Sequence, residues 1–137
     1  MKKLKEKVQI VVLAENQVLL LQFATLYNKG FQNITGSVEA NESFHEAAVR
    51  ELEEETQLKS PLIKIEQENN FIDRFGFQVT EAIFYTHFEK IPEIKISEEH
   101  CSFKWIPFAM INESDYVFPS NLQATQTAIK IVQKNEN

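Results

Sequence analysis

A glutamate-rich segment from Gly36 to Leu58 most strongly limits what this chain can fold into. It reads GSVEANESFHEAAVRELEEETQL and holds seven glutamates in 23 residues. Ser43, followed three positions later by Glu46, is typical of a capping box, in which each side chain accepts a hydrogen bond from a backbone N–H at a helix start. Residues that favour helix follow. We therefore predict a helix from Ser43 to Thr56.

A helical wheel divides the side chains of this predicted helix among three positions. The predicted core face comprises Phe44 at its edge, Ala48, Val49 and Leu52. The side facing water comprises Glu46, Arg50 and Glu53. Glu51 and Glu55 fall beside the core face, and Glu54 is adjacent to them. The three consecutive glutamates therefore do not form one uniform surface.

The carboxylates of Glu51 and Glu55 need a compensating partner. Like charges four residues apart repel, and burying them unpaired costs free energy. No Lys or Arg lies at helical spacing on that edge, because the wheel directs Arg50 away. A hard divalent cation suits the position, since Mg²⁺ takes oxygen ligands and is commonly held by carboxylates together with substrate phosphates. The alternative is a solvated acidic helix.

The patterns on either side of the helix predict a sheet. The predicted strands are Val8–Ala14, Val18–Gln22, Ile63–Ile65, Phe75–Phe88 and Phe103–Ile106, and a short apolar patch from Phe31 to Ile34 precedes the glutamate segment. The first two strands are separated by Glu15–Gln17 and are expected to form an antiparallel hairpin. Ser120 or Asn121 is expected to cap a last helix. Because strands precede and follow the acidic helix, we expect an α/β (α+β) fold with a mixed sheet packed between helices.

Length and charge limit the classes of partner. The chain of 137 residues suits one domain covering residues 1–137. Its net charge of -6 argues against a general nucleic-acid surface, so we expect no DNA partner. No stretch is long enough to span a membrane, and without a secretory signal the chain is expected to be cytoplasmic. Its single cysteine, Cys101, is expected to be a small core residue. The sequence leaves a homodimer open.

The acidic segment resembles the sequence box of the Nudix hydrolases. That box is Gly, five residues, Glu, seven residues, Arg-Glu, an aliphatic, any residue, Glu-Glu, any residue, Gly and an aliphatic. The matching residues are Gly36, Glu42, Arg50, Glu51, Leu52, Glu54, Glu55 and Leu58. Gln57 stands where the family usually has glycine. Glycine lets the chain turn at positive φ, so Gln57 predicts either strain or a different helix end.

The resemblance implies an α/β/α sandwich and a Mg²⁺- or Mn²⁺-dependent attack of water on a diphosphate linkage of a small phosphorylated substrate. By this resemblance, Glu51, Glu54 and Glu55 match the glutamates that supply the family's metal site. Glu42 and Arg50 match residues that mainly support the structure of the box.

A narrower resemblance, to the bacterial dATP or dihydroneopterin triphosphate pyrophosphohydrolases, extends over most of the chain. It rests on FQNITGSVEANES, EEHCSFKWI and SNLQA. It implies that Glu99 is an additional metal ligand or the base that orients water, and the catalytic base is then Glu54 or Glu99. The residues implied near the substrate are Phe31, Thr35, Gly36 and Asn121. The histidines show no metal-ligand spacing, and we do not expect His100 to contact the site although it follows Glu99.

Three interpretations of function follow. The leading one is hydrolysis of a nucleoside triphosphate such as dATP, or of dihydroneopterin triphosphate, to the monophosphate and pyrophosphate. The second is a Nudix hydrolase of another substrate, such as a nucleoside diphosphate sugar, a dinucleoside polyphosphate or an RNA 5′ end. The third is a Nudix-like module that binds a nucleotide without cleaving it. Gln57 favours the third, whereas the intact acidic triad of Glu51, Glu54 and Glu55 argues against it.

Overall fold

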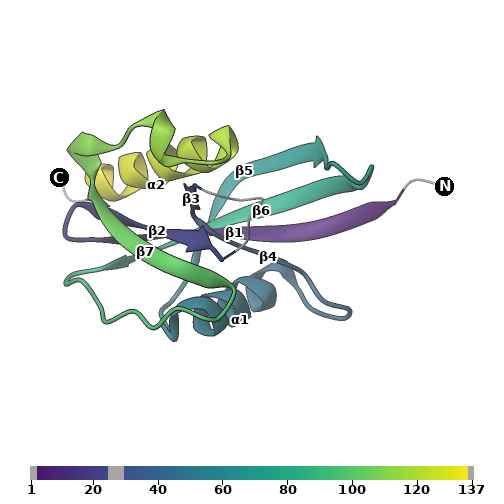
Figure 1. Ribbon diagram of the computed structural model, residues 1–137, viewed down its shortest axis with the longest axis horizontal. Coiled ribbons are helices and arrows are strands. Elements are labelled where there is room, and N and C mark those ends of the chain that lie inside the picture. Colours follow the sequence, from purple (N-terminus) through teal and green to yellow (C-terminus); the bar gives the residue numbers. More distant parts are fainter. Residues whose placement is uncertain (1–2, 25–29, 136–137) are drawn as a thin grey trace.

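The computed structural model describes residues 3–24 and 30–135 as a mixed β-sheet with a helix on each face (Figure 1). The strands are β1 (Leu4–Ala14), β2 (Gln17–Phe23), β3 (Phe31–Gln32), β4 (Ile34–Ser37), β5 (Ile63–Ile72), β6 (Gln78–Phe88) and β7 (His100–Pro107). The helices are α1 (Phe44–Thr56) and α2 (Pro119–Asn135), and two 3₁₀ turns cover Phe108–Met110 and Glu113–Asp115. The predicted mixed sheet between helices is confirmed.

Strand β1 is central to the sheet. It pairs in parallel with β6 along its whole length, from Leu4 opposite Gln78 to Ala14 opposite Phe88. Strand β6 then pairs antiparallel with β5, which forms one edge. From Val8 to Ala14, β1 is buried on both faces and apolar except for Gln9, as expected for a strand in a parallel pair, whereas its first four residues are exposed or half-buried.

The other half of the sheet divides into two branches. Strands β1 and β2 form the predicted antiparallel hairpin, but their paired residues lie only next to the turn. The turn residues Glu15 and Asn16 have φ values of 47° and 60°, which suits a tight two-residue hairpin. Beyond the hairpin, β4 pairs with β1, whereas β3 and β7 pair with β2. The strands β1 and β2 therefore separate after the turn, and each continues with strand partners of its own.

The two helices cover opposite faces of the sheet (Figure 1). Along β1, Val8, Ile10 and Val12 pack in the cluster that contains α1. The alternate residues Val11 and Leu13 pack in the cluster that contains α2. This alternation follows from the two-residue repeat of a strand, and it produces two apolar layers that hold the helices.

Three predicted boundaries were wrong. The segment from Asp73 to Phe77 is a turn, in which the Asp73 carboxylate accepts the backbone N–H groups of Phe75 and Phe77, and Gly76 has a φ of 86°. Strand β6 therefore begins at Gln78. Strand β5 continues to Ile72, although its polar residues gave no clear alternation. Helix α2 begins at Pro119, since proline suits the first helical position, so Asn121 lies inside the first turn instead of capping it.

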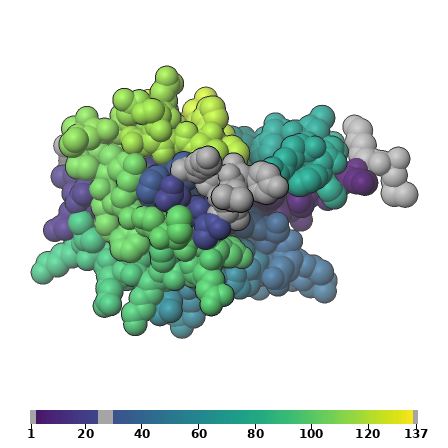
Figure 2. Space-filling view, viewed as in Figure 1, coloured from purple at the N-terminus to yellow at the C-terminus, as the bar shows by residue number. Residues whose placement is uncertain are grey.

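One end of the sheet projects from the rest of the molecule. The β5–β6 end and the start of β1 extend beyond the helices in Figure 2, where β5 and β6 are teal. Leu4, Ile72 and Phe75 on this end are exposed. Among the described residues, none of the helices is long and apolar enough to cross a membrane. The sequence also holds a polar stretch, YNKG at residues 27–30, which is expected to lead into the apolar patch at Phe31 and which falls mainly outside the described residues.

Candidate metal centre

Both ends of α1 are fixed by local hydrogen bonds. The Ser43 hydroxyl accepts the N–H of Glu46 at 3.0 Å, and the Glu46 carboxylate accepts the N–H of Ser43 at 2.9 Å, which confirms the predicted capping box. At the other end, Gln57 has φ 61° and ψ 21°, and its N–H donates to the Glu53 carbonyl at 2.8 Å. The helix thus keeps a left-handed end that glycine would adopt more easily, and the side chain of Gln57 costs about 1 kcal/mol there.

The acidic residues of α1 differ sharply in burial. Glu51 is 8% exposed and Glu55 is 3% exposed, whereas Glu53 and Glu54 lie on the surface. The predicted placement of the first two beside the core is confirmed. Val49 was wrongly assigned to the core, since it is 39% exposed. Ala47 is buried instead, with Ala48 and Leu52, so the core face of α1 is centred closer to Glu51 and Glu55 than the wheel indicated.

Gly36 of β4 lies directly against Glu51. A Cβ atom at residue 36 would lie 2.1 Å from Glu51 Cδ and 2.3 Å from Glu51 Oε1. Residue 36 is held in place by its pairing with Val8 of β1. The bare backbone at this position therefore provides the space for a buried carboxylate.

The Arg50 guanidinium donates hydrogen bonds to three carboxylates and one backbone carbonyl. Its Nε and Nη2 donate to the two oxygens of Glu42 at 2.8 and 3.0 Å, and Nη2 also donates to the Ser37 carbonyl at 2.8 Å. Its Nη1 donates to Glu51 Oε1 at 2.9 Å and to Glu54 Oε2 at 3.2 Å. The prediction that Arg50 points away was wrong, because a wheel gives the direction of Cβ, whereas the long side chain carries the charge elsewhere.

Two carboxyl groups in contact with Arg50 have pKa values that are shifted in opposite directions. Hydrogen bonding to Arg50 lowers the pKa of Glu42 to about 2. Burial raises the pKa of Glu51 to about 7, although Arg50 opposes that increase. The Arg50–Glu42 pair thus joins the loop before α1 to the helix, while the pKa of the buried Glu51 stays raised even with the Arg50 guanidinium beside it.

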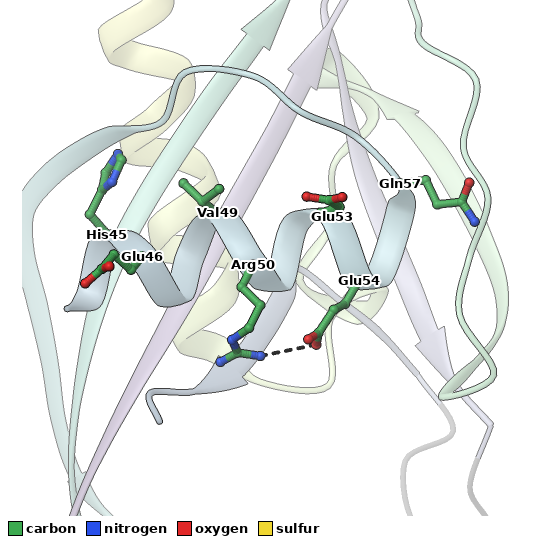
Figure 3. A pocket seen from close by; sticks show the side chains of 7 residues that line it. All are labelled: His45, Glu46, Val49, Arg50, Glu53, Glu54 and Gln57. Atoms are coloured by element: carbon green, nitrogen blue, oxygen red, sulfur yellow. Dashed lines mark hydrogen bonds and ion pairs between the residues drawn. The ribbon is translucent and has the colours of Figure 1, made fainter. Parts of the chain in front are cut away.

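The carboxylates of Glu51, Glu54 and Glu55 converge on one position. Each offers an oxygen that lies within 4.8 Å of the oxygens offered by the other two. Three carboxylate oxygens at such spacing fit a hard divalent cation such as Mg²⁺ or Mn²⁺. A shallow pocket of about 750 Å³ runs along the exposed side of α1, and Figure 3 shows Arg50 and Glu54 on one side of it and His45 and Val49 on the other. The carboxylates, and not this hollow, define the site, because neither Glu51 nor Glu55 lines it.

The segment before β7 supplies partners for Glu55. Ser97 donates a hydrogen bond to Glu55 Oε2 at 2.9 Å, and His100 Nδ1 contacts the same oxygen without being aligned for a regular hydrogen bond. Burial would raise the pKa of Glu55, but His100 and Ser97 outweigh it and lower that pKa. The prediction that His100 stays away from the site was wrong.

Glu99 lies between these two partners. Its N–H donates to the Ser97 hydroxyl at 3.3 Å, and its carbonyl accepts the N–H of Ala24 at 2.9 Å. The charge of Glu55, and then burial, raise the pKa of the Glu99 carboxyl group. Glu99 is exposed and therefore lies beside the acidic cluster, open to solvent.

A β-bulge explains the direction of His100. In the β2–β7 ladder, Gln22 pairs with Ser102 and Phe23 pairs with His100, so Cys101 is an extra residue on β7. A bulge changes the direction of a neighbouring side chain. The ring of His100 is stacked on Phe23 with 4.8 Å between centroids. Cys101 is exposed, and its predicted place in the core was wrong because the extra residue has no inward position.

The predicted substrate residues other than Gly36 lie outside the acidic cluster. Asn121 is 2% exposed, and its Oδ1 accepts the N–H of Asn33 at 2.8 Å. The Thr35 hydroxyl accepts a hydrogen bond from Gln32 at 3.1 Å, and the Lys104 ammonium lies 4.2 Å from the Phe31 ring centroid. Asn121 and Phe31 are on the α2 side of the sheet, opposite α1.

A buried polar network on the α2 side was not predicted. Asn33 Nδ2 donates to Gln9 Oε1 at 2.8 Å and to the Thr125 hydroxyl at 3.0 Å. Gln9 Nε2 in turn donates to Glu81 at 2.9 Å, and Tyr116 donates to Thr125 at 3.0 Å. The one polar residue in the apolar run VQIVVLA, Gln9, was the available signal for it. The network joins α2 to β1 and β6 and to Asn33 between β3 and β4.

Comparison with solved structures shows the same fold in proteins with several activities. The dihydroneopterin triphosphate pyrophosphohydrolase of E. coli superposes with a TM-score of 0.79 at 26% identity, over 92% of this chain and 97% of that one. The NUDIX domain of Shewanella oneidensis NrtR, complexed with ADP ribose, gives 0.80 at 20% identity, over 96% and 90%. A C. elegans Ap4A hydrolase gives 0.73 at 20% identity, over 93% and 98%.

A curated relative is much longer than this chain. It is an octanoyltransferase of Myxococcus xanthus, 33% identical over 101 residues, which are 67% of this chain and 27% of that protein. The similarity therefore concerns only part of the relative. The model of the NUDIX domain family matches residues 3–126, a range that includes the capped helix, its acidic cluster and the segment before β7. This chain belongs to the NUDIX domain family.

Proposed function

We propose that the protein is a divalent-metal-dependent pyrophosphohydrolase that converts a nucleoside triphosphate such as dATP, or dihydroneopterin triphosphate, to its monophosphate and pyrophosphate. The observation that carries this proposal is that Glu51, Glu54 and Glu55 of α1 each place a carboxylate oxygen close to those of the other two. Membership of the NUDIX domain family supports the reaction class. The likeness to the E. coli dihydroneopterin triphosphate enzyme, which extends over nearly all of both chains, supports the substrate class.

The buried and the exposed glutamates would have different roles in this reaction. Glu51 and Glu55 would hold Mg²⁺ or Mn²⁺ from the buried side and Glu54 from the exposed side, with Glu99 as a further ligand or a base. When bound, the cation would neutralise phosphate charge and lower the pKa of a water molecule. Gly36 leaves room for the Glu51 carboxylate, and the Arg50–Glu42 pair fixes the loop before the helix.

Glu54 or Glu99 would accept the proton of the attacking water on a carboxylate oxygen. Both carboxylates are exposed next to the buried pair, so both can meet a substrate that enters from solvent. On the narrower resemblance alone we also propose Phe31, Thr35, Gly36 and Asn121 as residues near the rest of the substrate, although Phe31 and Asn121 lie on the α2 side of the sheet and Asn121 is buried.

Gln57 gives no support to a binding module without catalysis. Its backbone adopts the left-handed conformation that the usual glycine would provide, so α1 ends at residue 57 with the backbone that the sequence box calls for. A small phosphorylated molecule is therefore the proposed partner. One domain covering residues 1–137, a cytoplasmic location, the absence of a DNA partner and a homodimer stay predictions from the sequence.

A substrate panel tests the proposal. The protein with Mg²⁺ would be offered dATP, the other triphosphates, dihydroneopterin triphosphate, ADP-ribose and a dinucleoside polyphosphate, and every product would be identified. We expect pyrophosphate and a monophosphate, with loss of turnover in EDTA and in Glu55→Gln. Two monophosphates from ADP-ribose would assign the second substrate class, and tight binding without any turnover would contradict the enzyme.

A further inference from the structure

We propose that His100 and Ser97 are positioning residues, which hold the Glu55 carboxylate by its Oε2 atom and so direct its other oxygen toward the metal. This inference rests on the metal centre of the proposed function. It adds two residues outside the acidic helix, and neither of them needs to touch the metal or the substrate.

The contacts place both residues on the same oxygen. Ser97 Oγ lies 2.9 Å from Glu55 Oε2, and His100 Nδ1 contacts that atom too. The side chains of His100 and Glu55 are each 3% exposed, so water competes little with these contacts. With Oε2 engaged twice, Oε1 is the oxygen of Glu55 left for a cation. Partners that lie behind a ligand in this way orient it and commonly change metal affinity by about 10- to 100-fold.

The segment from Ser97 to His100 is itself held as a unit. The N–H of His100 donates to the Ser97 carbonyl at 3.1 Å, and the N–H of Glu99 donates to the Ser97 hydroxyl at 3.3 Å. The turn that they close places Glu99 between the two partners of Glu55. The same attachment therefore sets both the orientation of Glu55 and the position of Glu99 beside it.

Strand β2 supports this arrangement from behind. The bulge at Cys101 turns His100 toward α1, and Phe23 stacks on the imidazole with an interplanar angle of 18°. Ala24, the next residue of the chain, donates its N–H to the Glu99 carbonyl at 2.9 Å. The ring of His100 is thus fixed on one face by an aromatic side chain, which limits the rotation that would break its contact with Glu55.

Binding of Mn²⁺ to the whole protein, measured by electron paramagnetic resonance of the free ion, tests the inference without using turnover. We expect His100→Leu and Ser97→Ala each to weaken Mn²⁺ binding roughly tenfold or more. His100→Asn should restore affinity close to that of the wild type, because its amide N–H group lies near the position of Nδ1. His87→Leu is the matched control, since His87 is exposed on β6, and should bind Mn²⁺ as the wild type does.

Thermal unfolding in EDTA separates positioning from folding. Ser97 is only half-buried, so Ser97→Ala should unfold close to the wild-type temperature while it still loses affinity. The inference is overturned if both His100→Leu and Ser97→Ala bind Mn²⁺ as tightly as the wild type, or if His100→Asn binds as poorly as His100→Leu. If the wild-type protein and Glu55→Gln bind Mn²⁺ equally weakly, the metal centre itself is absent and both proposals fail.

Discussion

Gly36 and Glu51 share a space that only one side chain can fill, because a Cβ at residue 36 would lie 2.1 Å from Glu51 Cδ. The atoms that it would meet belong to the end of a flexible side chain, which can move aside. Gly36→Ala should therefore fold but displace the Glu51 carboxylate, and we expect Mn²⁺ affinity to fall at least tenfold with a stability loss of less than about 1 kcal/mol. Calorimetric titration and urea unfolding measure the two effects.

Gly76 provides the opposite case and serves as the control. It has a φ of 86°, and no atom within 4 Å would meet a Cβ there. Gly76→Ala should lose about 1 kcal/mol of unfolding free energy through backbone strain while it keeps Mn²⁺ affinity. Equal affinities in Gly36→Ala and Gly76→Ala would show that Glu51 does not contribute to the metal site.

Substitution of a buried glutamate should stop turnover without unfolding the protein. Glu55→Gln keeps the shape of the side chain but removes the charge offered to the cation, so we expect kcat to fall at least about 100-fold. Glu53→Gln is the matched control on the same helix, since Glu53 is exposed and lies outside the cluster of three carboxylates. Steady-state rates with saturating Mg²⁺ make the comparison, and a near-normal rate for Glu55→Gln would refute the metal assignment.

Burial of Glu51 should make the metal-free protein less stable as the pH rises. Its pKa is about 7 in the folded chain, above the ordinary value of 4.5. Between these values the folded state binds more protons than the unfolded state, so stability is lost from about pH 4.5 to 7, by up to about 3 kcal/mol. Glu51→Gln lacks this carboxyl group. Its free energy of unfolding relative to that of the wild type should therefore increase by that amount from about pH 4.5 to 7, as measured by urea unfolding in EDTA.

Glu42 supplies the contrasting control for this pH dependence. Its pKa is lowered to about 2 by Arg50, so its contribution to stability is complete above its ordinary value of 4.5 and is lost as the pH falls toward 2. The difference between Glu42→Gln and the wild type should thus stay constant from pH 5 to 8. If the stability of Glu51→Gln relative to the wild type changed with pH no more than that of Glu42→Gln, Glu51 would be ruled out as the source of the pH dependence.

The left-handed end of α1 gives a stability prediction. Gln57 has a φ of 61°, a conformation that costs a residue with a Cβ about 1 kcal/mol relative to glycine. Gln57→Gly should stabilise the protein by about that amount in urea unfolding. Gln57→Ala keeps a Cβ and should bring no comparable gain. If both substitutions stabilise equally, the backbone strain at residue 57 is not the cause.

Local patterns predicted the parts of this protein that local interactions determine. The capping box at Ser43 and Glu46, the hairpin turn at Glu15 and the inward placement of Glu51 and Glu55 all follow from contacts between near neighbours in the sequence. A wheel gives the direction in which a side chain leaves the helix. It therefore located the acidic cluster from the sequence alone.

The errors arose where side-chain reach or pairing between distant segments decides the outcome. Arg50 reaches four acceptors because its guanidinium lies far from its Cβ. His100 faces Glu55 because a bulge in the β2–β7 ladder adds one residue, and a single-residue shift reverses the side of the strand that a residue faces. No pattern within one segment specifies that shift.

The parallel pairing of β1 with β6 has a consequence for how the protein is made. The apolar cluster beneath the helix that bears the glutamates includes Ala82 and Phe84 of β6, which leave the ribosome after the helix does. Contacts between segments so far apart in the sequence form late in folding. The newborn chain thus holds its acidic helix on only the part of this apolar layer that comes from β1, β2 and β4, and the cation-binding position is complete only when Ser97 to His100 have also been synthesised.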